Sequence, residues 1–284
     1  SDESTVQVEL IQSVSARGID TAVSVLLESA QKRDRAVQRA ALKALAVLGR
    51  PQDIPVLAGM LMVRPQRAIE DALVAIAETH DQAETVAASV LGPAQAASNT
   101  AKQAVLRVVT RLGEDRGLTF VEQQVQSTNQ QVRTAAVRAL STWSTRTPMP
   151  LALRIAKDDD NLTRRILAFR GYVNMAVLPS DESAAQVFAA LARAMAIAAR
   201  DEEKKMVLSA LPKAPCKAAL DFAQQQLKQP QLRAEAQTAI VGICNGLAES
   251  DPSTVREVLT KLLKAKMNKN VEDAAKRVLA KVNQ

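Results

Sequence analysis

Only one histidine is present in the chain, and its neighbours do not complete a metal site or a catalytic pair. His80 lies in the segment Glu78-Thr79-His80-Asp81, and Glu84 is the only residue three or four positions further on that could complete a site. A metal site needs several convergent His, Cys or carboxylate ligands. We therefore expect His80 to be a solvent-exposed residue in a turn between two helices.

The other reactive residue types are equally isolated. The aspartates Asp158-Asp159-Asp160 could attract calcium, but no glycine turn or distal glutamate follows at the spacing of a calcium loop. We expect them to form an acidic cap before the next helix. Cys216 and Cys244 do not make a disulfide framework, and we expect buried, unreactive thiols.

Motifs with a known chemical mechanism are also missing. The sequence contains no glycine-rich phosphate loop, nucleophile elbow, zinc-ligand spacing or Cys-x-x-Cys-His haem attachment site. It therefore predicts no catalytic residue, no metal site and no cofactor. The expected class is a protein that is not an enzyme.

The elements that position the side chains follow a repeat with a period of roughly 32 residues. A short helical phrase returns seven times at nearly regular steps, except that the step from Phe169 to Leu208 is clearly longer than the others. A two-helix unit of this length cannot bury its apolar side alone, so the copies must stack on one another. The first residues of the copies are Leu42, Leu73, Leu106, Val137, Phe169, Leu208 and Ile240.

A second amphipathic helix is predicted between successive copies, at 19–30, 54–63, 118–126, 150–156 and 218–227. Their ends show start and stop chemistry: Asp53, Ser180 and Asp251 can cap helices, and Gly49 and Gly113 can end them. The prolines fall at predicted helix ends, and no segment alternates with period two. The predicted fold is all-α. The long step before Leu208 predicts a bulge formed by the loop and longer helix around 180–199.

The segments 34–42 and 129–137 resemble the turn and second helix of HEAT repeats, in which a polar turn residue precedes Val-Arg and then Ala and Leu. The resemblance covers nearly the whole chain. It implies a right-handed α-solenoid of about eight antiparallel HEAT-like helix pairs, forming one domain over 1–284. We expect an N-terminal capping helix over 1–17, repeats over 18–267 and a C-terminal capping helix over 268–284.

The segments 160–172 and 201–211 resemble HEAT segments of large bacterial multidomain proteins. In those proteins the array accompanies a concanavalin-like sugar-active domain or a cytochrome-type module, and many of them are exported. The resemblance implies that the chain is a segment of a larger protein. It favours an exported or periplasmic location and leaves a cytoplasmic one open. The start at Ser1-Asp2 without Met is expected of a processed or excised chain.

One position of the repeated phrase points away from the predicted core and is basic in four of the seven copies. In HEAT arrays the second helix lines the concave surface, so these side chains would form a basic stripe there, interrupted at Val74. Gln103 and Thr134 lie one turn earlier on the same face. Such a stripe could bind an acidic peptide or phosphates, or be a solvated face with local ion pairs. The basic residues are Lys43, Arg107, Arg138 and Arg170.

Charge and composition limit the possible partners. The net charge is +7, and residues 251–284 contain eight Lys and Arg against four Asp and Glu. A basic end can attract nucleic acid, anionic lipid or an acidic protein. Nucleic-acid-binding surfaces usually add stacking aromatic residues, whereas only 2% of this chain is aromatic. The apolar runs are too short to cross a bilayer, so we expect no membrane span.

The predicted function is a non-catalytic scaffold whose concave surface binds a protein or a neighbouring domain of a parent chain. The alternative is a nucleic-acid-binding protein of the HEAT-like alkylpurine DNA glycosylase kind, which uses exposed aromatic residues in a basic groove. We expect Trp143 and Tyr172 to be core residues instead. One histidine cannot supply the His-Glu pairs of HEAT-like metal hydroxylases. Self-association through an end repeat is a third possibility.

Overall fold

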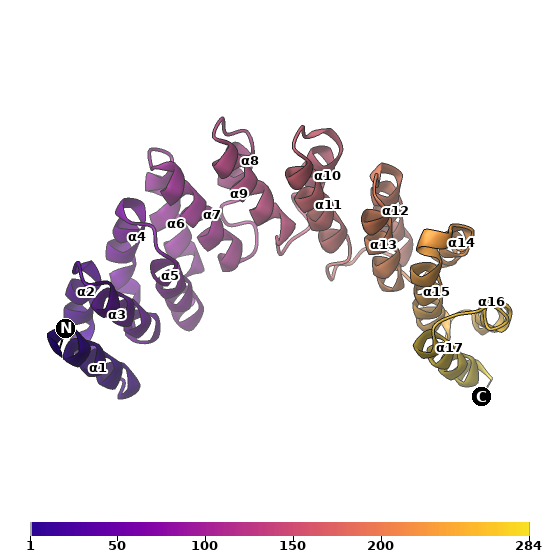
Figure 1. Cartoon of the computed structure of the whole chain (residues 1–284), viewed down its shortest axis with the longest axis horizontal. Helices are drawn as coiled ribbons and strands as arrows, with labels where there is room; N and C mark the ends of the chain where they lie inside the picture. Colours follow the sequence, from indigo (N-terminus) through magenta and orange to yellow (C-terminus); the bar gives the residue numbers. More distant parts are fainter. Residues whose placement is uncertain (1, 284) are drawn as a thin grey trace. The chain divides into compact units, whose positions relative to one another are not determined.

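The computed structural model describes residues 2–283, and every regular element in this range is a helix (Figure 1). The all-α prediction is confirmed for these residues. The helices fall into two compact units, Ser1–Thr145 and Arg146–Gln284. The first unit contains α1 (Asp2–Ala16), α2 (Val23–Gln31), α3 (Arg35–Leu48), α4 (Ile54–Val63), α5 (Arg67–His80), α6 (Ala83–Ala94), α7 (Asn99–Leu112), α8 (Leu118–Val125) and α9 (Gln130–Ser141).

The second unit follows the same alternation of helices. Short 3₁₀ turns lie at η1 (Asp20–Ala22) and η2 (Pro51–Asp53) in the first unit and at η3 (Leu211–Lys213) and η4 (Pro230–Leu232) in the second. The helices of the second unit are α10 (Met149–Asp158), α11 (Leu162–Ala176), α12 (Ala184–Ile197), α13 (Asp201–Ala210), α14 (Lys217–Gln226), α15 (Arg233–Leu247), α16 (Pro252–Leu262) and α17 (Lys269–Val282).

Each unit has two layers of helices. In the first unit α2 packs on α3, α4 on α5, α6 on α7 and α8 on α9, while α3, α5, α7 and α9 contact one another in that order. In the second unit α11, α13, α15 and α17 form the corresponding row, paired with α10, α12, α14 and α16. We call each row of odd-numbered helices the odd layer of its unit. Sequential packing of this kind is consistent with the predicted α-solenoid.

The ends of the chain join these layers. Helix α1 packs against α3, within the range predicted for an N-terminal capping helix. Helix α17 lies within the range predicted for a C-terminal capping helix and packs against α15 and α16. Since α15 packs in the same way against α13 and α14, α17 is the last helix of the odd layer.

Short polar side chains begin several helices of the odd layer. The Asp34 carboxylate accepts hydrogen bonds from the backbone N–H groups of Ala36 and Val37 at 2.8 and 3.0 Å. Asn129 caps α9 and Asn161 caps α11 in the same way. These caps satisfy N–H groups that the helix leaves without partners.

The predicted cap Asp251 is confirmed in the other layer, at the start of α16. Its carboxylate accepts a hydrogen bond from the backbone N–H of Thr254 at 3.1 Å. Pro252 occupies the first position of the helix, where a missing N–H costs no hydrogen bond.

Three predicted boundaries were wrong. The Asp53 carboxylate accepts from Arg50 N–H at 2.8 Å, so it closes the turn η2 and does not cap α4. Helix α12 is capped by Ser183 and not by Ser180, because Ser183 and Gln186 form a reciprocal capping box. Pro93 lies inside the last turn of α6, one residue before its end.

Close approach of backbones fixes part of the second unit. A Cβ atom added at Gly242 would lie 2.7 Å from Pro212, and one added at Gly246 would lie 2.5 Å from Pro215. Real Cβ atoms do not approach carbon atoms this closely. The two glycines of α15 therefore let the segment at and after η3 pack directly against the helix backbone.

Candidate functional site

No cluster of three or more His, Cys, Asp or Glu side chains that could hold a metal occurs in residues 2–283. His80 ends α5, and its Nε2 lies 3.1 Å from the backbone carbonyl oxygen of Gly49. His80 is exposed, as predicted, but it is the last residue of a helix and not a turn residue, and it ties α5 to the end of α3. Glu84, the predicted possible second ligand, pairs instead with Arg116 at 3.3 Å.

The three aspartates do not form the expected acidic cap. Asn161 caps α11, while the carboxylate of Asp159 is buried and accepts from Arg164 Nε at 2.9 Å. Asp160 accepts from the same guanidinium at 2.8 Å. The hydrogen bond to Asp159 raises the pKa of Arg164 above its ordinary value. Asp159 and Arg164 form a buried ion pair at the start of α11, and the sequence pattern did not reveal Arg164 as the partner of Asp159.

The predicted core aromatic residues are buried. Trp143 is 4% exposed and donates from Nε1 to Asp115 at 3.1 Å. Tyr172 is 3% exposed, and its hydroxyl donates to the backbone carbonyl of Ala190 at 3.2 Å. Burial raises the pKa of Tyr172. Neither ring lies on a surface where it could stack on a base.

Both cysteines are free thiols. Cys244 is buried, as predicted, and burial raises its pKa to about 12. Cys216 is only partly buried, so the prediction of a buried thiol is wrong at that position. A thiol is a nucleophile only as thiolate, which makes Cys244 unreactive at neutral pH.

The four basic residues of the predicted stripe all have exposed side chains on odd-layer helices. Lys43 lies on α3, Arg107 on α7 and Arg138 on α9, in the first unit, whereas Arg170 lies on α11 in the second unit. The structure therefore brings the first three into one odd layer.

The stripe is interrupted in α5, but at Ala75 and not at Val74. Val74 is 1% exposed and belongs to the core, while the next residue, Ala75, is partly exposed. The burial pattern of α3 returns in α5 one position later than the alignment of Leu42 with Leu73 indicated. Ala75 is thus the counterpart of Lys43 in α5, and it carries no charge.

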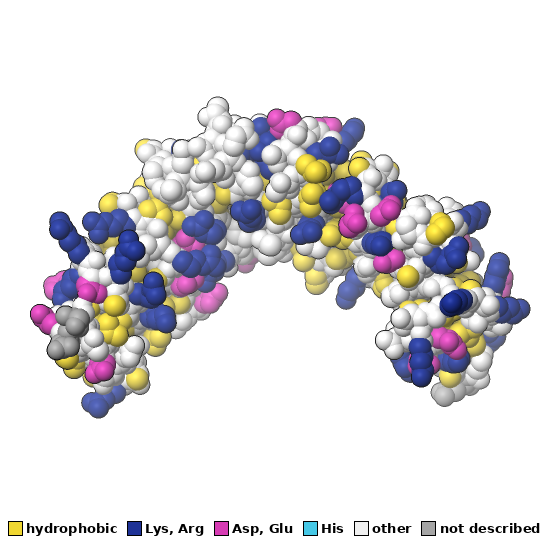
Figure 2. All heavy atoms as spheres, in the orientation of Figure 1, with side chains coloured by type: hydrophobic (Ala, Val, Ile, Leu, Met, Phe, Trp, Pro, Cys, Tyr) yellow, Lys and Arg dark blue, Asp and Glu magenta, His cyan; other side chains and the backbone are white. Residues whose placement is uncertain are grey.

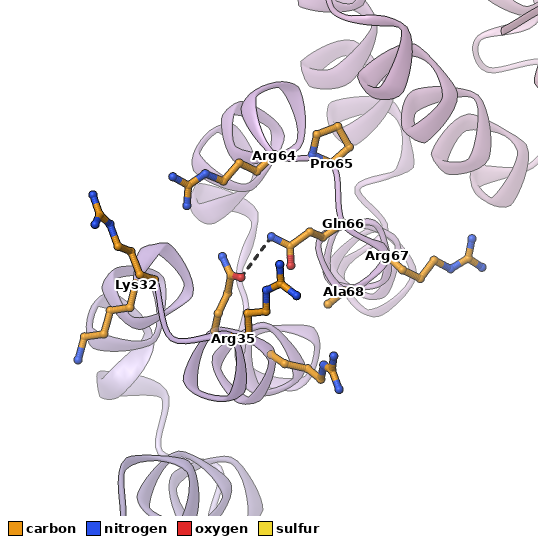
Figure 3. A pocket seen from close by; sticks show the side chains of 10 residues that line it. Lys32, Arg35, Arg64, Pro65, Gln66, Arg67 and Ala68 are labelled. Carbon is orange, nitrogen blue, oxygen red and sulfur yellow. Dashed lines mark hydrogen bonds between the residues drawn. The ribbon is translucent and has the colours of Figure 1, made fainter. Parts of the chain in front are cut away.

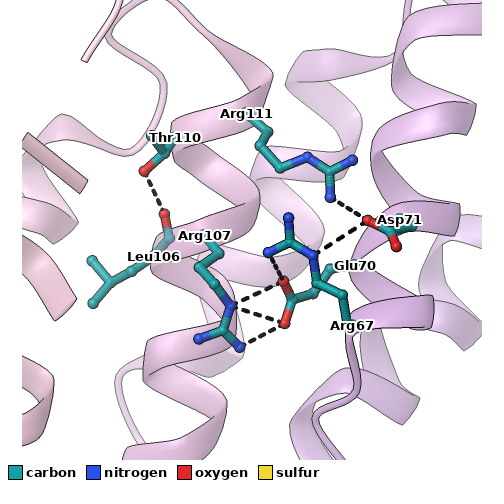
Figure 4. A network of polar contacts seen from close by, with 7 residues as sticks. All are labelled: Arg67, Glu70, Asp71, Leu106, Arg107, Thr110 and Arg111. Carbon is teal, nitrogen blue, oxygen red and sulfur yellow. Dashed lines mark hydrogen bonds and ion pairs between the residues drawn. The ribbon is translucent and has the colours of Figure 1, made fainter. Parts of the chain in front are cut away.

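Arg107 belongs to a network of five charged side chains between α5 and α7 (Figure 4). Its Nη2 lies 2.6 Å from Oε1 of Glu70, a carboxylate with no exposed area. Arg67 contacts Glu70 at 3.3 Å, and Asp71 contacts Arg111 at 2.6 Å. A buried carboxylate needs such hydrogen-bonded cations. The sequence indicated Arg107 but not Glu70, which occupies a core position of α5.

A groove of about 280 Å³ lies beside this network, along α7 and α9. Leu106, Ala135 and Ala139 provide its apolar part. The predicted residues Arg107, Arg138 and Gln103 all line it, while Thr134 does not. Within residues 2–283 the Arg138 guanidinium has no ion-pair partner, in contrast to the other arginines of the groove. The complete lining is Arg67, Gln103, Leu106, Arg107, Thr110, Arg111, Ala135, Arg138, Ala139 and Thr142.

A second hollow, which was not predicted from the sequence, lies at the turns that lead into α3 and α5 and is lined by six Lys and Arg residues. The sequence does contain a sign of this hollow, namely two basic clusters one repeat apart. They are Lys32-Arg33 with Arg35, and Arg64 with Arg67. In Figure 2, Lys and Arg side chains gather over α2–α5 on the face that is shown.

No family model matches the sequence, and no curated protein matches it. Among solved structures the chain is similar to one described as "Computational Design of Self-Assembling Cyclic Protein Homooligomers". The two chains share 15% identity over 98% of this chain and 94% of the other, with a TM-score of 0.16. So low a score supports no inference about fold or function. None of the helices in residues 2–283 has the length and apolar character needed to cross a membrane.

Proposed function

We propose that this protein is a non-catalytic binding module of the HEAT type, a right-handed solenoid of about eight antiparallel helix pairs. Its odd-layer surface binds an acidic segment of a partner protein or of a neighbouring domain in a larger parent chain. The observation that supports this most directly is the groove of α7 and α9, where an apolar strip lies between arginines. Such a surface suits a peptide that presents carboxylates next to aliphatic side chains.

The pairing of the arginines favours a protein over nucleic acid. Glu70 and Asp71 neutralise much of the charge of Arg67, Arg107 and Arg111. Affinity for nucleic acid depends on cations that are free to displace counterions from phosphates. Arginines that are already paired with Glu70 and Asp71 bind phosphates more weakly. The glycosylase-like alternative therefore remains the second choice.

Arg138 is the residue of the groove best placed to contact a carboxylate of the partner. It is exposed, and no acid of the described chain pairs with it. The positive charges of Arg107 and Arg111 are already offset by Glu70 and Asp71, so their attraction for a ligand carboxylate is weaker. We extend the proposal to Lys43 in the same unit and to Arg170 on the odd layer of the second unit.

The test is selection of peptides from a random display library on the immobilised full chain. We expect enrichment of sequences with Asp or Glu next to Leu, Ile or Val, whose binding is weakened by Arg138→Glu. The matched control is Arg154→Glu, an exposed arginine of α10 without an ion pair in residues 2–283. Enrichment without acidic residues would overturn the proposal. So would tight, steeply salt-dependent binding of a generic duplex, which would establish the nucleic-acid alternative.

A further inference from the structure

A cavity of about 620 Å³ lies between the turn that joins α2 to α3 and the turn that joins α4 to α5 (Figure 3). It is distinct from the groove of α7 and α9 and shares only Arg67 with it. Its size is within the range of small-ligand sites. The lining residues are Lys32, Arg33, Arg35, Gln38, Arg39, Arg64, Pro65, Gln66, Arg67 and Ala68.

The charge of the cavity is almost uncompensated. Within residues 2–283, four of its arginines have no ion pair or side-chain hydrogen bond. Among the described residues, the Lys32 ammonium hydrogen-bonds only to the amide oxygen of Gln7, at 3.4 Å. Arg67 is the exception, because its guanidinium pairs with Glu70 and Asp71, and its side chain extends away from Lys32 in Figure 3. The four arginines are Arg33, Arg35, Arg39 and Arg64.

The nearest acid in the sequence is already engaged elsewhere. Asp34 lies in the α2–α3 turn, but its carboxylate caps α3 through Ala36 and Val37 and accepts a hydrogen bond from Ser4. The Ser4 hydrogen bond and the backbone donors lower the pKa of Asp34. No Asp or Glu of the described part of the chain lines the cavity. Like charges at this density repel one another, and a bound anion would remove that cost.

The floor of the cavity is held by two amides. Gln38 is buried and donates from Nε2 to the carbonyl oxygen of Ala30 at 2.9 Å. Gln66 in turn donates from Nε2 to Oε1 of Gln38 at 3.3 Å, the contact drawn in Figure 3. This pair links the first turn of α3 to the segment between α4 and α5, so it fixes the two sides of the cavity relative to each other. It also occupies the Gln66 side chain, which gives α5 no capping hydrogen bond.

We propose that this cavity binds a compact ligand with more than one phosphate group. A phosphate carries a charge of about −1.5 to −2 at neutral pH, so four unpaired arginines match about two or three such groups. The planar guanidinium matches the spacing of phosphate oxygens and binds them through paired hydrogen bonds. The cavity has no aromatic side chain for base stacking. This favours a short phosphate chain, either free or as part of a nucleotide, over a nucleic-acid strand.

The experiment is isothermal titration calorimetry of the full chain with inorganic tripolyphosphate at constant ionic strength. One saturable site is expected, with an affinity about tenfold or more above that for inorganic phosphate. The double variant Arg35→Gln with Arg64→Gln should weaken tripolyphosphate binding by about tenfold or more. The control, Arg154→Gln with Lys157→Gln, removes the same charge from exposed positions of α10 and should change the affinity by less than about twofold.

Further arms identify the source of the phosphate groups and the specificity of the site. Equal affinities for ATP and tripolyphosphate would assign a free phosphate chain, and tighter binding of ATP would assign a nucleotide. Arg138→Glu should leave tripolyphosphate binding unchanged, because Arg138 does not line this cavity. Equal weakening in the test and control variants, absence of saturation, or tighter binding of longer duplexes would each overturn the proposal. Thermal unfolding of each variant shows that the fold is retained, as expected for exposed positions.

Discussion

Replacing Arg164 by valine is expected to destabilise the second unit strongly. Arg164 is 1% exposed, and its Nε and Nη2 both lie 2.9 Å from the buried carboxylate of Asp159. The variant would leave the carboxylate of Asp159 buried without the guanidinium, while the Asn161 N–H would still donate to it at 2.8 Å. Breaking a buried ion pair on one side costs about 3–5 kcal/mol. The bond to Asp160 adds little, because that carboxylate is 82% exposed.

The first unit indicates how the loss can be reversed. Val132 of α9 follows the cap Asn129 by three residues, as Arg164 follows Asn161. Ser127 lies two residues before the cap Asn129, and its hydroxyl accepts from Asn129 N–H at 3.3 Å. The carboxylate of Asp159 accepts from Asn161 N–H in the same way. The double variant Asp159→Ser with Arg164→Val therefore reproduces the arrangement found at α9. Replacing both charges is expected to restore the free energy of unfolding to within about 1 kcal/mol of the unchanged chain.

The assay is urea denaturation followed by circular dichroism, with hydrogen exchange of α10 and α11 peptides to place the change in the second unit. The Asp159→Ser single variant completes the cycle and is also expected to be destabilised, since it leaves Arg164 buried without Asp159. A cost below about 1 kcal/mol for Arg164→Val would refute the assigned role of the ion pair. A double variant no more stable than Arg164→Val would refute it as well.

Three further predictions concern packing, pH and thiol reactivity. Gly246→Ala should lower the free energy of unfolding by about 1–3 kcal/mol, because the added Cβ would meet Pro215. Gly59→Ala is the control: nothing lies within 4 Å of the added Cβ, so the free energy of unfolding should rise by about 0.5–1 kcal/mol in the same urea denaturation. Asp34, Glu249, Asp251 and Glu272 have lowered folded-state pKa values, through hydrogen bonds from Ser4, Lys281, Thr254 and Lys276 respectively. These carboxyls therefore stabilise the fold above the ordinary carboxyl pKa and lose this effect as pH falls through the lowered values. Denaturation between about pH 7 and 3 should therefore show declining stability below about pH 4, and a rise there would contradict the assignment. Iodoacetamide should modify Cys244 only after unfolding, whereas partly buried Cys216 reacts sooner; equal rates measured by mass spectrometry would disprove this.

Helix positions could be predicted from sequence because apolar spacing and caps act over a few residues. The helix expected at 54–63 is α4 with the same limits, and Asp251 caps α16 as its Asp-Pro pair indicated. The register of the second copy could not be predicted in this way. Leu73 and Val74 are both apolar and both buried. Only the order of buried and exposed positions along α3 and α5 shows that Val74, and not Leu73, is the counterpart of Leu42.

The charged contacts depended on packing between helices and escaped prediction. Glu70 is buried because Arg107, far away in the sequence, reaches across from α7, and no local pattern joins the two. Arg164 occupies a buried position that is apolar in α9, because Asp159 lies five residues before it and accepts from its guanidinium. The basic stripe was predicted from periodicity alone. The difference between Arg107, which pairs with Glu70, and Arg138, which has no ion pair within residues 2–283, followed only from the packing of the helices.

The most direct test of the proposed function is a charge exchange at Arg138. An acidic peptide selected on the unchanged chain is titrated by fluorescence anisotropy against Arg138→Glu, and then a peptide with its Asp and Glu replaced by Lys is titrated against both proteins. We expect Arg138→Glu to weaken binding of the acidic peptide by about three- to tenfold and to bind the basic peptide better than the unchanged chain does. Arg154→Glu should alter neither affinity. Equal effects of the two substitutions, or no gain for the basic peptide, would contradict the proposed function.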